Sequence, residues 1–234
     1  MYMFNYQDFG LKKDNLYEII ATTYSITENG MQIKPNASCM GIRMIEDTLI
    51  QISPFYSTTT YKNLKEQSII AINFVDDVYL YALAALKEPD SVINLTDFPI
   101  KYYDFKNIEA RNMDIPYIRK AWGILIGEVI QEFQKNKIDD LGEYIMPVFK
   151  LKVFYSEKLK QSYKLFNRAE NLALETIILA TRLKVAKENE DQSIFSKNYE
   201  KIRDYKENIK RFGKNEKALK AIELVSRYID KLMK

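Results

Sequence analysis

The chain has 234 residues, 47% of them hydrophobic, and its 35 Lys and Arg residues nearly balance 32 Asp and Glu residues. These values indicate a globular protein of one or two domains and exclude wholesale disorder. Because the chain has no histidine, it cannot hold a Ser-His-Asp or Cys-His relay, a His-ligated zinc or an imidazole pH switch. A single cysteine excludes an internal disulfide and a thiolate metal cluster, and it suits a reducing cytoplasm.

The start of the chain and its apolar runs predict a protein with no signal peptide and no membrane span. Residues 1–8 lack a basic start followed by an apolar stretch. The longest apolar runs, such as 122–127 and 176–180, are far shorter than the roughly 20 residues that a membrane span needs. We therefore expect a soluble, cytoplasmic protein.

The first part of the chain has the pattern of short strands joined by turns. Residues 16–24 are rich in β-branched and aromatic residues, and Asn29-Gly30 then supplies the positive φ angles of a tight hairpin. Short connections favour an antiparallel barrel over a doubly wound sheet. Residues 86–119 contain three prolines and are the predicted excursion from the barrel, a loop or lid. Further strands are predicted at 40–45, 48–53, 68–74, 121–131 and 148–155.

The last part of the chain has helical patterns and a different charge. Residues 1–150 carry a net charge of −5, and residues 151–234 carry +8. We place the boundary near 156–164, which gives predicted domains of residues 1–158 and 159–234. Three helices are expected: one after an Asn167 N-cap, one over 195–212 ending at Gly213, and one from about Asn215.

Four hydroxyl-bearing residues in succession lie between a predicted strand and a short predicted helix. Backbone N–H groups at a helix start, the helix dipole and hydroxyl donors together make a good phosphate seat, to which Lys62 adds a countercharge. The plainer interpretation, which spacing alone favours, is a Thr-rich loop with one N-cap residue. The stretch lacks the glycines and the Gly-Lys-Thr core of a P-loop. The four residues are Ser57, Thr58, Thr59 and Thr60.

A second candidate stretch, residues 34–41, is a run of small residues that leads into a strand. Small side chains let a flat ligand approach the backbone, and Asn36 and Ser38 offer hydrogen bonds to its polar edge. A hairpin arm that needs small residues is the plainer interpretation, and residues alone favour it. Cys39 is a candidate reactive thiol, but with no histidine to activate it a packed, inert cysteine is favoured.

Three other features favour structural roles. The pairs Asp76-Asp77 and Asp139-Asp140 lack the multi-oxygen pattern of a calcium loop, so turns and caps are predicted and no metal site is. Trp122 is a candidate for stacking on a ligand, although core packing is favoured. The basic C-terminal helices are candidates for binding nucleic acid, but their Lys residues are interspersed with Glu and Asp, as on a solvated helical face.

The order of several motifs resembles one family. These motifs include Asn36-Ala37-Ser38-Cys39 and the run Thr58-Thr59-Thr60-Tyr61-Lys62-Asn63-Leu64. Their order and content resemble an uncharacterised, largely archaeal family of FMN-binding split-barrel proteins, related in fold to flavin reductases and carrying a helical C-terminal extension. The resemblance spans most of the chain and is weakest over 86–119. The remaining motifs are residues 17–23, 40–43, 72–77, 167–170 and 180–183.

The resemblance implies a mainly β fold, α+β overall: a six-stranded antiparallel FMN-binding split barrel with a small C-terminal helical subdomain. It further implies noncovalent FMN, generally at a homodimer interface. Where the family has a small residue and often a proline after the Asn-Ala pair, this sequence has Ser38 and Cys39. The implied phosphate contacts are Ser57, Thr58, Thr59, Thr60, Lys62 and Asn63, and the implied isoalloxazine contacts are Asn36, Ala37, Ser38 and Cys39.

The function that the resemblance implies is that of a flavin-dependent oxidoreductase, similar to NAD(P)H:flavin reductases, with NAD(P)H or a small-molecule acceptor as partner. In such a site the flavin supplies the redox chemistry, while the protein sets its orientation, solvent access and potential. No catalytic residue or substrate is predicted. Two alternatives stay open: a non-catalytic FMN-binding carrier or sensor, and a nucleic-acid-binding module that uses the basic C-terminal helices.

Overall fold

The computed structural model describes residues 6–27, 32–88, 94–139, 142–161, 168–211 and 215–233. The chain divides into two compact units, the first formed by residues 1–76, 99–138 and 143–162 and the second by residues 77–98, 139–142 and 163–234. Four sequence predictions fall outside the described residues: the Asn29-Gly30 turn, the Asn167 cap, the Gly213 helix end and the role of Asp140.

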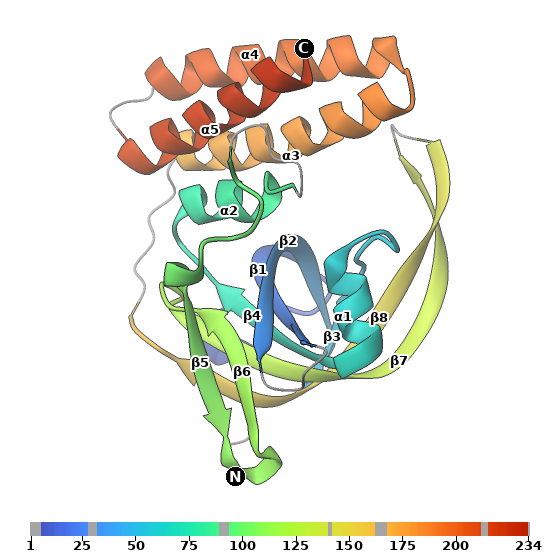
Figure 1. Cartoon of the computed structure of the whole chain (residues 1–234), viewed down its shortest axis with the longest axis vertical. Helices are drawn as coiled ribbons and strands as arrows, with labels where there is room; N and C mark the ends of the chain where they lie inside the picture. The colour runs from blue at the N-terminus through green and yellow to red at the C-terminus, as the bar shows by residue number, and fades with distance from the viewer. Residues whose placement is uncertain are drawn as a thin grey trace. The chain divides into compact units, whose positions relative to one another are not determined.

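Six antiparallel strands close a barrel in the first unit, in the order β1-β2-β3-β8-β7-β4 (Figure 1). The predicted six-stranded antiparallel barrel is confirmed. Each predicted strand is present, but β2, β7 and β8 extend well beyond the predicted ranges 40–45, 121–131 and 148–155. The barrel strands are β1 (Leu16–Ile26), β2 (Ile33–Glu46), β3 (Leu49–Ile52), β4 (Ile69–Phe74), β7 (Gly123–Asp139) and β8 (Gly142–Lys158).

Apolar side chains fill the barrel. Successive residues of a strand point to opposite faces, so every second side chain of each strand enters the interior. Fully burying an aliphatic or aromatic side chain of this size contributes about 1.5–3 kcal/mol, so the interior is the main source of stability in this unit. Trp122 is partly buried and packs against this core, and its ring stacks on Phe74 at 5.1 Å between ring centroids, which agrees with the packing role that the sequence favours. The largest fully buried side chains of the interior include Ile19, Ile42, Ile50, Ile72 and Phe149.

A β-hairpin packs against the outer wall of the barrel. Its strands β5 (Tyr103–Ile108) and β6 (Met113–Ile118) pair only with each other and are joined by the 3-10 turn η3 (Glu109–Arg111). Buried Asn73 of β4 accepts a hydrogen bond from the Ile118 N–H, and Thr22 of β1 donates to the Pro116 carbonyl. The excursion predicted over 86–119 is therefore present. It is a hairpin fixed to the wall over residues 103–118 rather than a loop or lid.

One short helix, α1 (Thr59–Gln67), connects β3 to β4, as predicted (Figure 1). Thr58 is its N-cap, since the Thr58 Oγ1 atom accepts from the Tyr61 N–H at 3.2 Å. The helix ends at Ser68, whose left-handed φ of 57° stops the helical backbone. Two 3-10 turns, η1 (Tyr6–Phe9) and η2 (Ile100–Tyr102), complete the first unit.

The second unit consists of α2 (Val78–Ala85), α3 (Arg168–Glu188), α4 (Gln192–Arg211) and α5 (Glu216–Leu232). The three C-terminal helices agree with the sequence, whereas α2 was not predicted. Six of the eight α2 residues are buried, and the helix packs on α3 and α5. The structure therefore groups residues 77–98 with the helices, although the predicted boundary at 158/159 assigns them to the barrel. No helix among the described residues is long and apolar enough to cross a membrane.

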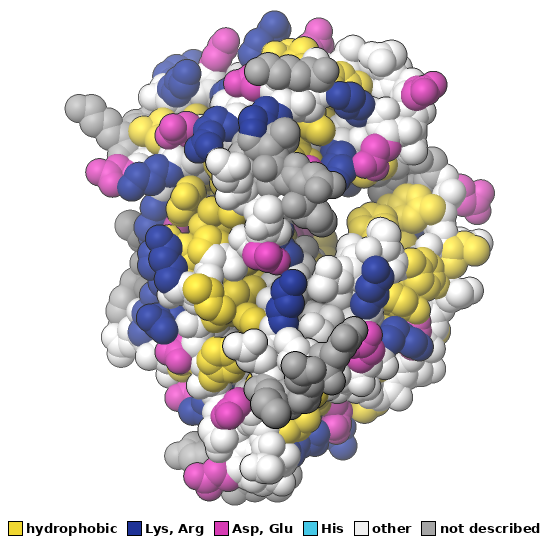
Figure 2. All heavy atoms as spheres, viewed as in Figure 1, with side chains coloured by type: hydrophobic (Ala, Val, Ile, Leu, Met, Phe, Trp, Pro, Cys, Tyr) yellow, Lys and Arg dark blue, Asp and Glu magenta, His cyan; other side chains and the backbone are white. Residues whose placement is uncertain are grey.

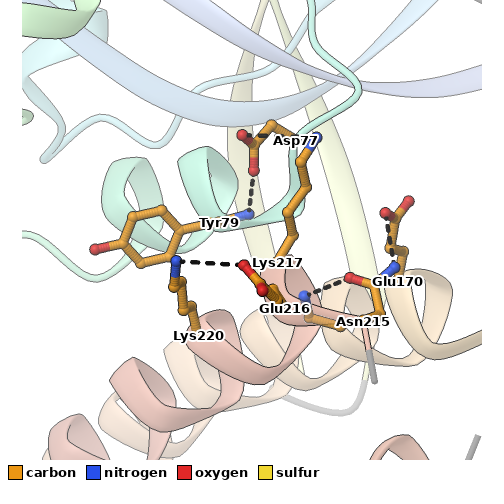
Figure 3. Close-up of polar contacts among 8 residues, drawn as sticks. Asp77, Tyr79, Glu170, Asn215, Glu216, Lys217 and Lys220 are labelled. Atoms are coloured by element: carbon orange, nitrogen blue, oxygen red, sulfur yellow. Dashed lines mark hydrogen bonds and ion pairs between the residues drawn. The ribbon is translucent and has the colours of Figure 1, made fainter. Parts of the chain in front are cut away.

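Polar contacts join the starts of α2 and α5 (Figure 3). Asp77 caps α2, because its Oδ1 accepts from the Tyr79 N–H at 3.2 Å, and its other carboxylate oxygen lies 3.8 Å from Lys217 Nζ. Asn215 caps α5 and donates from Nδ2 to Glu170 Oε1 at 3.1 Å. The cap role that the sequence favoured for this aspartate pair is thus confirmed at Asp77.

Candidate functional site

Hydrogen bonds join the two candidate stretches of the sequence. The Thr60 hydroxyl, in the first turn of α1, donates to Ser38 Oγ in β2 at 2.9 Å. Asn36 Nδ2, also in β2, donates to Thr60 Oγ1 at 3.2 Å. The hydroxyl-rich helix start and the small-residue strand therefore form one continuous region of the first unit.

The strand β2 has an open edge in this region. It pairs with β1 from Ile33 to Arg43, but its pairs with β3 run only from Arg43 to Glu46. Within the described residues, positions 33–42 therefore have no strand on the side away from β1, and this gap is the split in the barrel. A planar ligand that needs close approach to backbone would find it here, because residues 37–39 carry small side chains.

The four residues predicted to contact a ring edge lie on one strand but on two of its faces. Asn36 and Ser38 share a face with Thr23, the cross-strand partner of Asn36 in β1. Ala37 and Cys39 point to the opposite face, where Ala37 is completely buried and Cys39 is half-buried. The side chains cannot all meet one planar molecule, so Ser38 is the hydroxyl best placed to meet it.

The start of α1 keeps some of its hydroxyl groups for the fold and exposes others. Thr58 caps the helix, and its hydroxyl also donates to the Phe55 carbonyl at 2.7 Å, which agrees with the plainer interpretation of that residue. Ser57, Thr59 and Lys62 are exposed. A helix has no internal acceptor for the N–H groups of its first turn, so these exposed side chains stand beside backbone donors.

Five polar side chains form a cluster between β1, β2 and α1. Asn63 Nδ2 and Asn36 Nδ2 both donate to Thr23 Oγ1, at 3.1 and 3.3 Å, and Asn36 Nδ2 also lies 3.4 Å from Ser38 Oγ. Thr23, Asn36, Thr60 and Asn63 are at most 8% exposed, whereas Ser38 is half-buried. We call these five residues, Thr23, Asn36, Ser38, Thr60 and Asn63, the polar cluster.

Sequence reasoning missed Thr23. The only signal that could have found it is the β1–β2 register, in which Thr23 lies directly opposite Asn36. The connecting turn at 28–31 lies outside the described residues, and its length could not have been assigned from residues alone. A buried threonine in a β-branched run is otherwise typical of any strand.

Glu132 of β7 fixes the exposed face of α1 to the barrel. The Tyr61 hydroxyl donates to its Oε1 at 3.0 Å, and Lys65 Nζ lies 2.6 Å from its Oε2. Burial and the hydrogen bond to Glu132 raise the pKa of the Tyr61 hydroxyl, and the same carboxylate raises the pKa of Lys65. Both groups therefore stay protonated at neutral pH, and α1 keeps a cation one turn beyond Lys62. Nothing in the sequence pattern pointed to Glu132.

The fold and this site define a split-barrel protein with a helical C-terminal part. The chain belongs to the family described as "Protein of unknown function (DUF447) N-terminal domain", which matches residues 17–137, a range that contains the whole candidate site. The family membership expected from the motif order is thereby confirmed.

Two relatives are similar along most of their length. The chain is 25% identical over 190 residues to the uncharacterized protein MJ1453 of Methanocaldococcus jannaschii, which covers 78% of this chain and 85% of the relative. The crystal structure of the FMN-bound protein MM1853 of Methanosarcina mazei, from the same family, has a TM-score of 0.72 and 21% identity. That comparison covers 96% of this chain and 100% of the other, so the two proteins share the complete fold.

Proposed function

We propose that the protein binds FMN at the junction of β2 and α1 and acts as a flavin-dependent oxidoreductase of the flavin reductase kind. The observation that carries this proposal is the 2.9 Å hydrogen bond from Thr60 to Ser38, which joins an anion-binding helix start to a strand with an open edge. The fold shared with the FMN-bound protein MM1853 supports FMN as the ligand.

The phosphate of FMN needs donors and positive charge, and the start of α1 offers both. We assign direct contacts to the exposed side chains of Ser57, Thr59 and Lys62 together with the first N–H groups of the helix. Thr58 supports the seat as the N-cap. Thr60 and Asn63 support it from the polar cluster, where their side chains are almost completely buried.

The isoalloxazine needs a thin wall and a few hydrogen bonds, and β2 offers both at residues 36–39. Ser38 supplies a hydroxyl, the small side chains of Ala37 and Cys39 keep the strand thin, and Asn36 Nδ2 lies 3.4 Å from Ser38 Oγ. The residues present thus fit the ligand without a histidine. FMN supplies hydride transfer when it is bound, and the residues of this chain bind it, orient it and exclude water. NAD(P)H is the proposed electron donor, and the acceptor is a small molecule.

A second copy of the chain is the proposed protein partner. Figure 2 shows hydrophobic side chains gathered over the long β7–β8 ribbon, which includes Ile130, Ile138 and Ile145 at 49%, 77% and 54% exposure. Exposed aliphatic residues gathered on one surface mark interaction surfaces. Light scattering of the purified protein with FMN tests this assignment, with a mass of twice 27.6 kDa expected and the monomer mass contradicting it. The single cysteine supports a reducing compartment such as the cytoplasm.

The experiment that tests the function is a visible absorption spectrum, recorded before and after FMN is added and the protein is washed. A protein that stays colourless contradicts FMN binding. NADH and NADPH are then added separately. Reduction of the bound flavin faster than of free FMN supports the oxidoreductase, because only a protein that positions a donor against the flavin accelerates hydride transfer.

A non-catalytic FMN carrier or sensor is the second candidate. The ten residues predicted for the site carry amides, hydroxyls, one thiol and one ammonium group, with no carboxylate among them. That composition suits binding as well as it suits catalysis. A yellow protein whose flavin is reduced no faster than free FMN would support this candidate. The basic helices are a weaker candidate for nucleic acid, since Lys184 and Lys220 lie 3.9 Å from Glu188 and Glu216, each four residues away.

A further inference from the structure

We propose that Thr23 is a positioning residue for the bound flavin, and that it acts through the polar cluster to aim the Ser38 hydroxyl at the ligand. This inference rests on the proposed FMN site. It assigns a role to a residue that contacts neither the phosphate seat nor the open edge of β2, and it makes Ser38 a hydrogen-bond donor to an acceptor atom of the isoalloxazine.

The Thr23 hydroxyl oxygen accepts hydrogen bonds from two elements of the site. Asn36 reaches its Oγ1 from β2 at 3.3 Å, and Asn63 reaches the same atom from α1 at 3.1 Å. Thr23 itself belongs to β1 and is completely buried. The Thr23 Oγ1 atom therefore holds two side chains at once. One is Asn36 of β2, the strand proposed to bind the ring system, and the other is Asn63 of α1, the helix whose start is proposed to bind the phosphate.

The hydrogen bonds of the polar cluster run in one direction, from Asn36 and Thr60 to Ser38. A side-chain NH₂ group can only donate and has two hydrogens, so the oxygen atoms of Thr60 and Thr23 accept from Asn36 at 3.2 and 3.3 Å. Ser38 Oγ, at 3.4 Å from Asn36 Nδ2, shares one of these two hydrogens. The Thr60 hydrogen then goes to Ser38 Oγ. Ser38 accepts from both neighbours and keeps its own hydroxyl hydrogen for a further partner.

The exposure of the cluster members shows that the Ser38 hydroxyl hydrogen is the one that a ligand can reach. Four members of the cluster are at most 8% exposed, and Ser38 is the member that is half-buried. Ser38 is therefore the member of the polar cluster that a ligand bound at this part of β2 can reach. The pyrimidine end of a flavin carries carbonyl oxygens and ring nitrogens that accept hydrogen bonds, so its chemistry matches the donor that the cluster presents.

Removing the Thr23 hydroxyl would disturb this arrangement. The amide groups of Asn36 and Asn63 would each lose an acceptor in a buried place, and a buried N–H without a partner is costly. Rotation of Asn36 toward another acceptor relieves that cost but withdraws its hydrogen bonds from Thr60 and Ser38. The Ser38 hydroxyl is then free to turn inward, and the ligand loses a donor.

The test compares five variants, four single and one double, by the dissociation constants of FMN and riboflavin and by melting temperature. Thr23→Val is expected to weaken both ligands about fivefold to tenfold, as loss of one hydrogen bond of about 1 kcal/mol predicts. The affinities for FMN and riboflavin should fall by the same factor, because the two ligands share the ring system. Ser38→Ala is expected to do the same, and Thr23→Ser, which keeps the hydroxyl, is expected to stay within about twofold of the parent.

Thr22→Val is the matched control. Thr22 is the next residue of β1, is equally buried and also uses its hydroxyl, but it points to the other face and donates to the Pro116 carbonyl. Its loss should lower the melting temperature and leave both dissociation constants unchanged. A merely structural role for Thr23 predicts that Thr23→Val behaves as Thr22→Val does.

The double variant Thr23→Val, Ser38→Ala decides whether Thr23 acts through Ser38. It should bind flavin no more weakly than either single variant. A dissociation constant that rises by the product of the two single-variant factors overturns the proposal. Unchanged affinity in Thr23→Val also overturns it. If that variant does not fold, Thr23→Ala, which also lacks the hydroxyl, replaces it in the same assays with the same expected and contradicting outcomes. Failure of the parent protein to bind FMN is a different result, since it contradicts the proposed function itself.

Discussion

Asn73 and Ile118 are joined by a hydrogen bond of 2.7 Å from the Ile118 N–H to the Asn73 Oδ1 atom, across 45 residues of chain. The same side chain donates from Nδ2 to the Ile20 carbonyl at 2.8 Å and to Thr22 Oγ1 at 3.1 Å. One completely buried amide therefore connects β4, β1 and the β5–β6 hairpin. Because the hairpin covers the wall of β1, this contact also supports the strand that carries Thr23.

Asn73→Ala should destabilise the protein by about 3 kcal/mol, because it removes several buried hydrogen bonds that contribute about 1 kcal/mol each and leaves their partners unpaired. Urea denaturation measures the change. Asn107→Ala is the control, since Asn107 makes an exposed hydrogen bond of 2.8 Å to Asp114 within the hairpin and should change stability by less than about 0.5 kcal/mol. Equal losses in the two variants would contradict the assignment.

The double variant Ser57→Ala, Thr59→Val should weaken FMN about tenfold and leave riboflavin nearly unchanged, because only FMN carries the phosphate. Both side chains are exposed, so the melting temperature should stay close to that of the parent. An equal loss of affinity for FMN and riboflavin would contradict the assignment of the phosphate-binding site to the start of α1.

Replacing Thr58 and Thr60 together by Val should also weaken FMN more than riboflavin, but with a lower melting temperature. The Thr58 N-cap alone is worth about 1 kcal/mol. The ratio of the two dissociation constants, rather than stability, is the quantity that bears on the seat.

Cys39→Ser should leave the affinity for FMN and the colour of the bound protein unchanged. Cys39 is half-buried, lies on the face of β2 opposite Ser38, and is replaced by a side chain of similar size. A titration of FMN fluorescence measures the affinity. Loss of bound flavin in this variant would mean that the thiol takes part in the site.

The ion pair between Arg111 and Glu128 should make stability depend on pH. The Arg111 guanidinium donates to Glu128 at 2.6 Å and lowers the pKa of that carboxyl. A carboxyl with a lower pKa in the folded state stabilises the protein above its unfolded pKa, and this contribution is lost as pH falls through the folded value. Glu128→Gln should therefore lower the melting temperature at pH 7. The decrease in melting temperature between about pH 5 and pH 2 should be smaller in this variant than in the parent. An identical pH profile in the two proteins would contradict this.

Asp77→Ala should destabilise the helical unit by about 1 kcal/mol through loss of the α2 cap. Asp77→Asn keeps a good capping side chain and removes the charge that faces Lys217 at 3.8 Å. We expect the Asn variant to stay within about 0.5 kcal/mol of the parent, since the Lys217 side chain is half-exposed and its Nζ lies 3.8 Å from the carboxylate. Thermal unfolding followed by circular dichroism separates the two effects, and a larger loss in the Asn variant would show that the charge matters more than the cap.

The sequence predicted the barrel well where a strand has a strong local pattern and poorly where it does not. Residues 68–74 are β-branched and apolar, and the predicted strand differs from β4 by one residue. Pro35 and the small residues after it are atypical of strands, so the first half of β2 was taken for a hairpin arm. An open edge tolerates such residues, which is why they occur there. In α2, apolar side chains occupy all sides, so the helical period that would have revealed it is missing.

The candidate site divides in the same way. The hydroxyl run at 57–60 is a local feature that predicts one N-cap residue, and the structure shows that this residue is Thr58. The roles of Thr23 and Glu132 depend on which strands lie beside α1, and no local pattern carries that information. Sequence reasoning placed Asn36 and Ser38 in one run that leads into a strand, but it could not show that both lie within β2 or that Thr60 is bonded to both.

The discontinuity of the helical unit has a consequence for biosynthesis. The apolar helix α2 emerges from the ribosome long before α3 and α5, which bury it. At roughly 5–20 residues per second, the nascent chain must keep this segment from aggregating for several seconds while the rest of the barrel is translated. Until α3 and α5 have been made, the α2 segment is therefore an exposed apolar stretch of the nascent chain.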